Sequence, residues 1–189
     1  AICGGCLLQH MKIDSQLALK QQVLFDHLKH SAGLTEFTVI PAMASTSQSY
    51  RRKARLAVRY VHKKSDVLVG FREKASTFIT DMTRCTTLVS PVGNLIKALR
   101  ALLLGMEGCR DIPQIEVAVG ERSCVPTELL DSVLRVTMTI RHLEPLSDSD
   151  KQKLRDFADL HGIEWFLQAG GPNTVTRFWP ESDDDQLQY

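Results

Sequence analysis

The chain has 189 residues, of which 43% are hydrophobic, and its formal net charge is +1. This composition is enough to bury the core of one globular domain, and a charge near zero means that any signal for nucleic acid has to come from local clusters. Five scattered cysteines do not make a secreted disulfide framework, and no signal peptide or membrane-length apolar run is present. We therefore expect a cytoplasmic protein with no membrane partner.

The chain begins with two cysteines that enclose two glycines, Cys3-Gly4-Gly5-Cys6. Two thiolates at this spacing are compatible with a redox pair, half of a zinc site or part of an iron–sulfur ligand set. The glycines free the backbone to wrap around a bulky centre, and no strand pattern precedes them as a redox motif would require. The redox pair is therefore the least favoured of the three.

A helix is predicted next, with Asp14 or Ser15 as its N-terminal cap, running to about Ser31. Its apolar face consists of Leu17, Leu24 and Leu28, with Phe25 beside them. Residues 41–49 are small and polar without a period, which indicates a linker.

A sheet is predicted after the linker. From Arg52 to Val61, small or apolar residues alternate with basic ones, which is the period of a half-buried strand. Residues 66–73 and 77–81 are expected to continue it as a meander. Later strands are predicted over residues 115–119, 132–140, 163–167 and 174–178.

Two amphipathic helices are predicted between these strands. The first has Ser90 as its cap, Pro91 as its first residue and Gly105 at its end, and the second runs from Ser147 to Gly162. The fold class expected is α+β, with a largely antiparallel sheet, helices on one of its faces, and a cysteine loop and a separate N-terminal helix before it.

Charge is segregated along the chain. Between Arg51 and Lys64 there are seven lysines and arginines and no acid, whereas residues 181–185 carry only acidic charges. Tyr50 and Tyr60 flank the basic strand, so cations for phosphates and aromatic faces for bases occur together, as in single-stranded RNA binding. The alternative is a solvated strand face.

Five segments, in this order and spacing, resemble a known family. They are CGGCLLQH (3–10), YRRKARL (50–56), GFR (70–72), DMTRC (81–85) and RHLEPLS (141–147). The combination resembles the RNA 5-methyluridine methyltransferases, most closely members that methylate a uridine of 23S ribosomal RNA. Any one segment alone would be weak evidence.

The resemblance implies a central portion of such an enzyme. It places the catalytic domain, with its S-adenosylmethionine pocket and nucleophile, outside this chain, which starts at Ala1 and contains no motif of that domain. We therefore expect no catalytic residue here and an inactive fragment, monomeric, with 23S ribosomal RNA as its partner. Residues 1–46 would form the cysteine loop and a linking helix that packs on the absent catalytic domain, and residues 47–189 the RNA-contacting domain.

The resemblance also implies the site residues. Cys3, Cys6 and Cys85 would bind a 4Fe-4S cluster with a further cysteine from outside the chain; in the fragment, an empty site or a Cys3–Cys6 disulfide is the alternative. The RNA-binding candidates are Arg51, Arg52, Lys53, Arg55, Arg72 and Lys74. Strand alternation places Arg52 opposite Arg51, Lys53 and Arg55, so it is the one of these four that we expect to be structural, pairing with a carboxylate or capping a carbonyl. Leu7 and Thr86 depart from the family pattern without changing a ligand.

Two other classes of function stay open. In the first, His10 completes a Cys3His site and the chain is a non-catalytic zinc-dependent RNA-binding module. In the second, the basic strand is only a solvated face of a protein–protein interaction domain. Cys109 and Cys124 fit no ligand spacing and are interpreted as ordinary free cysteines.

Overall fold

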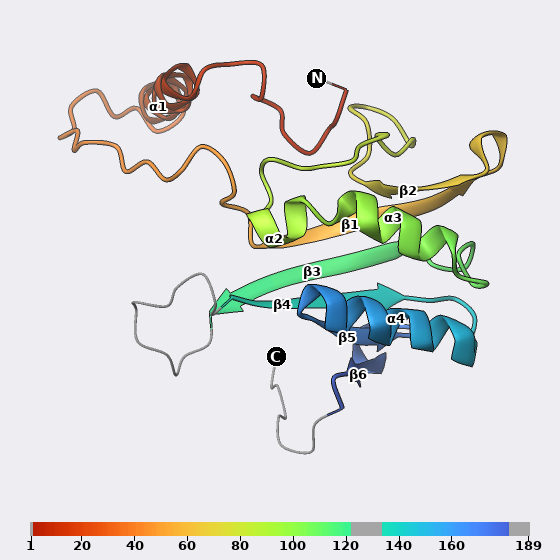
Figure 1. Ribbon diagram of the computed structural model, residues 1–189. Coiled ribbons are helices and arrows are strands. Elements are labelled where there is room, and N and C mark those ends of the chain that lie inside the picture. Colours follow the sequence, from red (N-terminus) through yellow and green to blue (C-terminus); the bar gives the residue numbers. More distant parts are fainter. Residues whose placement is uncertain (1, 122–133, 182–189) are drawn as a thin grey trace.

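The computed structural model describes residues 2–121 and 134–181. Its centre is a six-stranded sheet with the strand order β2-β1-β3-β4-β5-β6 (Figure 1). The strands are β1 (Lys53–Val61), β2 (Asp66–Gly70), β3 (Gln114–Glu121), β4 (Leu134–Arg141), β5 (Ile163–Gln168) and β6 (Val175–Trp179). All neighbouring pairs are antiparallel except β4 and β5, so the sheet is largely antiparallel, as predicted.

The helices of the body lie on one face of this sheet (Figure 1). They are α2 (Ser90–Gly93), α3 (Ile96–Leu104) and α4 (Asp148–His161), and short 3-10 turns occur at η1 (His62–Lys64) and η3 (Pro172–Thr174). Helix α4 provides the crossover that two parallel strands need, here between β4 and β5. The α+β class with helices on one face is therefore confirmed.

The core fills the space between the sheet and these helices. Every second strand residue points into it, and the fully buried side chains include Leu56, Ile115, Met138 and Trp165 from the strands and Ile96, Leu99, Leu103 and Leu154 from the helices. The opposite side of the sheet, called the open face below, carries the other strand residues. On β1 the exposed ones are Lys53, Arg55 and Arg59.

The predicted helix ends are partly right. Ser147 caps α4 by accepting a hydrogen bond from the backbone N–H of Asp150, and Gly162 ends it with a φ of 62°. The caps predicted for the other two helices are wrong: α1 (Ile13–His30) follows Lys12, which makes no side-chain cap, and α2 already includes Ser90.

The helix predicted from residue 90 to 105 is interrupted after α2. The carbonyl of Gly93 accepts a hydrogen bond from the N–H of Cys85 at 3.0 Å, a partner from another part of the chain. A helix restarts at Ile96. The sequence pattern could not reveal this break because its cause is a tertiary contact.

The strand predicted over residues 77–81 is also wrong. Residues 71–80 form a short irregular hairpin, in which Glu73 N–H donates to the Phe78 carbonyl and Thr80 N–H to the Phe71 carbonyl. Only the Arg72–Ile79 pair forms a bridge, and Ala75 turns the chain with a φ of 52°. A single bridge is too few paired residues to form a strand. The strand predicted over residues 66–73 is therefore shorter than expected, and β2 ends at Gly70.

Helix α1 and the chain that follows it form an arm (residues 13–48) that projects from the body (Figure 1). No residue of α1 is buried, and its contacts are local: the Phe25 and Phe37 rings lie 5.4 Å apart, and Leu34 N–H donates to the Leu28 carbonyl. Of its predicted apolar residues, Leu24 is exposed, and Leu17, Phe25 and Leu28 are half-buried. Within the described residues no helix is long and apolar enough to cross a membrane.

One arginine connects α3 to the edge of the sheet. Arg100, whose side chain is only 13% exposed, donates to the carboxylates of Asp66 and Asp81 at 2.6 and 2.7 Å. It also donates to the carbonyls of Val67 and Met82. Hydrogen bonds from Lys64 and Arg100 lower the pKa of Asp81 below its usual range.

We expect Arg100→Met to lower the free energy of unfolding by about 2 kcal/mol, because two carboxylates and two carbonyls lose a charged donor. Lys64→Met, which removes an exposed pair, should cost less than about 1 kcal/mol. Because the pKa of Asp81 is lowered, its stabilisation is complete above the ordinary carboxyl pKa and is lost as pH falls through the lowered value. Urea unfolding at neutral and acidic pH measures both effects; equal losses for the two variants would contradict the assigned role.

Candidate functional site

The cysteine loop is attached to the hairpin by backbone hydrogen bonds. Gly4 N–H donates to the Arg72 carbonyl at 2.8 Å, and Lys74 N–H donates to the Ile2 carbonyl at 3.1 Å. Cys3 forms an isolated antiparallel bridge with Glu73. The loop therefore has a defined position although it is far from the sheet in sequence.

Both glycines of the loop are required by close approach to the hairpin. A Cβ on Gly4 would lie 2.9 Å from the carbonyl oxygen of Arg72, and a Cβ on Gly5 would lie 3.0 Å from the Phe71 ring. The first contact is with rigid backbone, so a side chain there would displace the loop. The Gly-Gly pair thus allows the segment that contains Cys3 and Cys6 to pack closely against the hairpin.

The segment that carries Cys85 lies beside this loop. The Sγ of Cys6 is 3.1 Å from the Oγ1 of Thr87, two residues after Cys85. Cys3, Cys6 and Cys85 are free and partly buried, so the Cys3–Cys6 disulfide is not formed. Among residues 2–121 and 134–181, no three His, Cys, Asp or Glu side chains form a group that could hold a metal ion. A site shared by the three cysteines therefore stays a prediction.

The alternative zinc ligand His10 and the two other cysteines, Cys109 and Cys124, are considered next. His10 is exposed on the surface. Cys109 is a free thiol buried in the core, which agrees with its interpretation as an ordinary cysteine. Cys124 lies outside the described residues, as do residues 182–185 of the acidic segment.

Arg51 was predicted to contact RNA, but its side chain is directed to the cysteine loop. Its Nη2 donates to the Gly5 carbonyl at 3.3 Å, and its guanidinium lies 5.6 Å from the centre of the Phe71 ring. Its backbone N–H donates to the carbonyl of Thr87, whose side chain contacts the Sγ of Cys6. Arg51 therefore connects the loop, the hairpin and the Cys85 segment.

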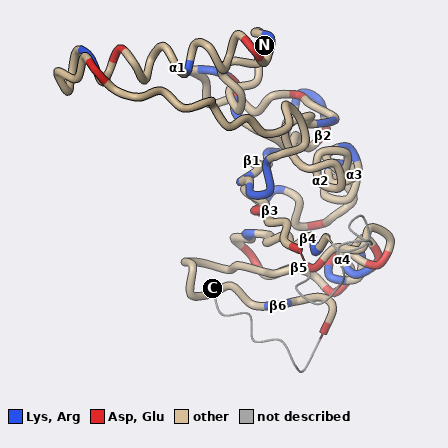
Figure 2. The backbone as a smooth tube through the Cα atoms, turned by 90° about the vertical axis from the view of Figure 1, so that its left-hand side faces the viewer, with Lys and Arg blue, Asp and Glu red and all other residues tan. Residues whose placement is uncertain are grey.

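The basic residues of β1 lie on one side of the sheet, and Arg52, just before the strand, lies on the other. Lys53, Arg55 and Arg59 are exposed on the open face. Arg52 points to the other side and pairs with Glu121 at 2.7 Å, so the carboxylate is its partner and not a carbonyl, the other partner expected for it. Arg55 pairs with Glu116 at 2.9 Å, which the sequence pattern did not predict. Figure 2 shows this basic stretch along β1.

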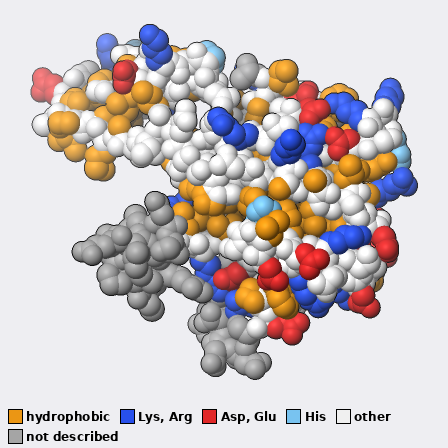
Figure 3. All heavy atoms as spheres, in the orientation of Figure 1, with side chains coloured by type: hydrophobic (Ala, Val, Ile, Leu, Met, Phe, Trp, Pro, Cys, Tyr) orange, Lys and Arg blue, Asp and Glu red, His pale blue; other side chains and the backbone are white. Residues whose placement is uncertain are grey.

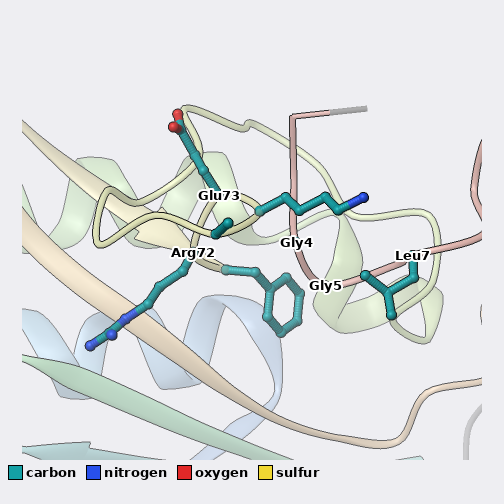
Figure 4. Close-up of a pocket in the computed structure, with 8 residues that line it drawn as sticks. Gly4, Gly5, Leu7, Arg72 and Glu73 are labelled. Carbon is teal, nitrogen blue, oxygen red and sulfur yellow. The ribbon is translucent and has the colours of Figure 1, made fainter.

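Arg72 and Lys74 extend from the hairpin and are exposed. A shallow hollow of about 270 Å³ lies there, lined by Gly4, Gly5, Leu7, Phe71, Arg72, Glu73, Lys74 and Ala75. Arg72 and Glu73 point in opposite directions from the hairpin (Figure 4). The hollow is thus lined by the cysteine loop and by two of the RNA-binding candidates, Arg72 and Lys74.

A second charged network on the open face was missed by the sequence analysis. Glu164 of β5 accepts hydrogen bonds from Arg135 of β4 and Arg177 of β6, and all three side chains are largely buried. Arg135 alternates with buried Val136 on β4, a pattern that identified the strand but not the partner. Sequence alone could not have paired residues from three strands without the register.

The helix side of the molecule offers a hollow of another kind. About 460 Å³ of space lies between α3 and α4, lined mainly by Ala98, Ala101, Leu102, Phe157 and Leu160. Apolar surface gathers between the two helices in Figure 3. It shares no residue with the cysteine loop or with the basic residues of β1.

The fold is found in a solved methyltransferase. The crystal structure of a tRNA (uracil-54, C5)-methyltransferase from Pyrococcus abyssi, in complex with S-adenosyl-L-homocysteine, matches 96% of this chain and 42% of that chain with a TM-score of 0.59. At 18% identity this likeness concerns the fold. No protein-family model matches the chain.

Curated relatives are much closer in sequence. The 23S rRNA (uracil(1939)-C(5))-methyltransferase RlmD of Hahella chejuensis is 41% identical over the whole chain and 40% of its own length. RlmD of Nitrosospira multiformis is 44% identical with the same coverage, and that of Xanthomonas campestris pv. campestris 43% over 95% of this chain and 38% of its own.

These relatives are homologues of the chain along its whole length. The resemblance to the RNA uracil-C5 methyltransferases is therefore confirmed, and within them the similarity is to the RlmD enzymes of 23S rRNA. The chain spans about 40% of the length of these curated relatives.

Arg51→Met should loosen the cysteine loop, because the Gly5 carbonyl and the Phe71 ring lose a charged partner. We expect alkylation of Cys3 and Cys6 to become about threefold to tenfold faster, with no change at buried Cys109. Arg59→Met, an exposed arginine of the same strand, is the matched control. Site-resolved mass spectrometry gives the rates; unchanged rates in Arg51→Met would mean that backbone hydrogen bonds alone hold the loop.

Proposed function

We propose that the chain is the central, iron–sulfur and RNA-binding portion of an S-adenosylmethionine-dependent 23S rRNA (uracil-C5)-methyltransferase. The observation that carries this proposal is the identity of 41–44% to RlmD enzymes along the chain. The methyl donor and the nucleophile would belong to a catalytic domain outside this chain. The chain by itself would bind RNA as a monomer and transfer no methyl group.

The proposed division of the chain is residues 1–46 and residues 47–189. The arm supports it, since α1 has no buried residue and exposes Leu19, Val23 and Leu24. An apolar helix surface of this kind is stable in water only with a partner. The catalytic domain would be that partner.

The donor set suits the proposed 4Fe-4S cluster. Cys3, Cys6 and Cys85 are free thiols, and soft thiolates are the usual ligands of iron–sulfur clusters. The tight attachment of Gly4 and the contact between Cys6 and Thr87 hold two ligand segments at one corner of the molecule. A further cysteine from outside this chain would complete the set.

Anaerobic reconstitution with iron and sulfide tests the cluster. We expect bound iron and acid-labile sulfide with a broad charge-transfer absorbance, lost in Cys85→Ser and retained in Cys109→Ala, because Cys109 belongs to the core. Metal analysis of the protein as purified is the second measurement. Zinc bound in place of iron would favour the non-catalytic zinc-dependent module, and iron binding that survives Cys85→Ser would exclude Cys85 as a ligand.

The RNA-binding surface would be the open face of the sheet near β1, together with Arg72 and Lys74. Lys53 and Arg59 are exposed there and have no ion-pair partner among the described residues. A cation without a partner can neutralise a phosphate without first breaking an ion pair. Arg51 and Arg52 would act differently, as supports of the cysteine loop and of the strand end.

Salt-dependent binding of a single-stranded RNA tests this surface. Lys53→Ala should reduce the magnitude of the slope of log K against log salt by about 0.7, the value for one lost phosphate contact. Arg52→Ala, which removes a cation on the opposite side, should leave the slope unchanged. Fluorescence anisotropy at several salt concentrations gives the slopes, and identical slopes for Lys53→Ala and the unaltered chain would leave β1 as a solvated face.

A further inference from the structure

The pair formed by Arg55 and Glu116 lies in the middle of the open face near β1. The two residues face each other across β1 and β3. Oε1 of Glu116 accepts a hydrogen bond from Nε of Arg55 at 2.9 Å and forms an ion pair with Nη2 of Arg55, also at 2.9 Å. Gln114, on the same strand, donates to the same oxygen at 2.9 Å. The carboxylate is therefore held by two hydrogen-bond donors while its side chain stays partly exposed, at 43%.

Glu116 is the only acid on the open face of β1 and β3, two strands that the structure describes in full. The other residues of that face are Lys53, Arg55, Ala57, Arg59, Val61, Gln114, Ala118 and Gly120. A single negative charge thus lies among three exposed cations. Glu164 of β5, another acid on this side of the sheet, is held by Arg135 and Arg177.

We propose that Glu116 is a specificity-determining residue that competes with RNA phosphates for Arg55. This inference rests on the proposed RNA-binding function. An exposed ion pair is weak enough for a phosphate to replace the carboxylate, but the carboxylate then remains nearby and repels that phosphate. Arg55 consequently adds affinity only where the RNA positions a phosphate well, and loosely bound RNAs gain little from it.

The consequence is that the contact between Arg55 and the RNA phosphate backbone is weaker for every RNA sequence. Phosphate contacts dominate non-specific affinity and carry no sequence information, so lowering their number favours RNAs that fit by shape or base contacts. Removing the charge of Glu116 should therefore strengthen binding to RNAs of unrelated sequence by similar factors.

The chain provides a matched control on the other side of the same strand. Glu121 pairs with Arg52 at 2.7 Å, and it follows Val119 on the side of β3 that faces the helices. Glu121→Gln and Glu116→Gln change the net charge equally and each leaves one arginine without a carboxylate. Only the second releases a cation on the open face.

The experiment is anisotropy titration of two single-stranded RNAs of unrelated sequence at several salt concentrations. Glu116→Gln is expected to raise affinity for both by about twofold to fivefold and to increase the magnitude of the salt slope by about 0.7. Glu121→Gln should change neither, and the gain should disappear in the double variant Arg55→Ala with Glu116→Gln.

The outcomes separate the inference from the function on which it rests. If the unaltered chain binds RNA but Glu116→Gln binds equally or less tightly, competition for Arg55 is excluded and the proposed function stands. Equal gains from both glutamine variants would assign the effect to net charge and overturn the role of Glu116. If neither the unaltered chain nor Glu116→Gln binds RNA, the proposed function and the inference fail together.

Discussion

The burial of one side of the sheet restricts where the charged side chains of its strands can lie. Helices α2, α3 and α4 cover one face, so the side chains of Leu56 and its neighbours at every second position are enclosed in an apolar core. A charged group in that space would lose its hydration without compensation. The basic residues of β1 therefore occupy the open face or the strand ends, and a shift of one residue in register would exchange the two sets.

The cysteine loop depends on the same sheet through backbone contacts. The hairpin that receives it continues β2, and Arg51, which precedes β1, connects the loop to the Cys85 segment through Gly5 and Thr87. The position of Cys3 and Cys6 is thus determined by strands more than forty residues away. A change in the loop would be transmitted first to Arg51 and to the start of the basic strand.

Local pattern was enough to predict the elements, and tertiary contacts explain what it missed. Alternation identified β1 and β4, and Ser147 and Gly162 marked both ends of α4. The break after Gly93 and the hairpin over residues 71–80 follow from hydrogen bonds to distant or turned segments. A single-sequence pattern contains no information on such partners.

The same distinction applies to the site. The cysteines and the basic strand are visible in the sequence as residue types at a spacing, and alternation placed Arg52 on the side opposite Lys53. The register of β1 with β3 then decides which carboxylate each arginine meets.

Charge placement therefore matters more than net charge in this chain. With a formal charge of +1 the molecule would have no general attraction for a polyanion. Several acids, however, are held away from the open face: Asp66 and Asp81 by Arg100, Asp150 by backbone N–H groups under α4, and Glu121 by Arg52. Compensating charge is thus distributed around the fold while Lys53 and Arg59 stay exposed on one surface. Glu116, the acid on the open face of β1 and β3, consequently reduces the positive potential of that surface around Arg55.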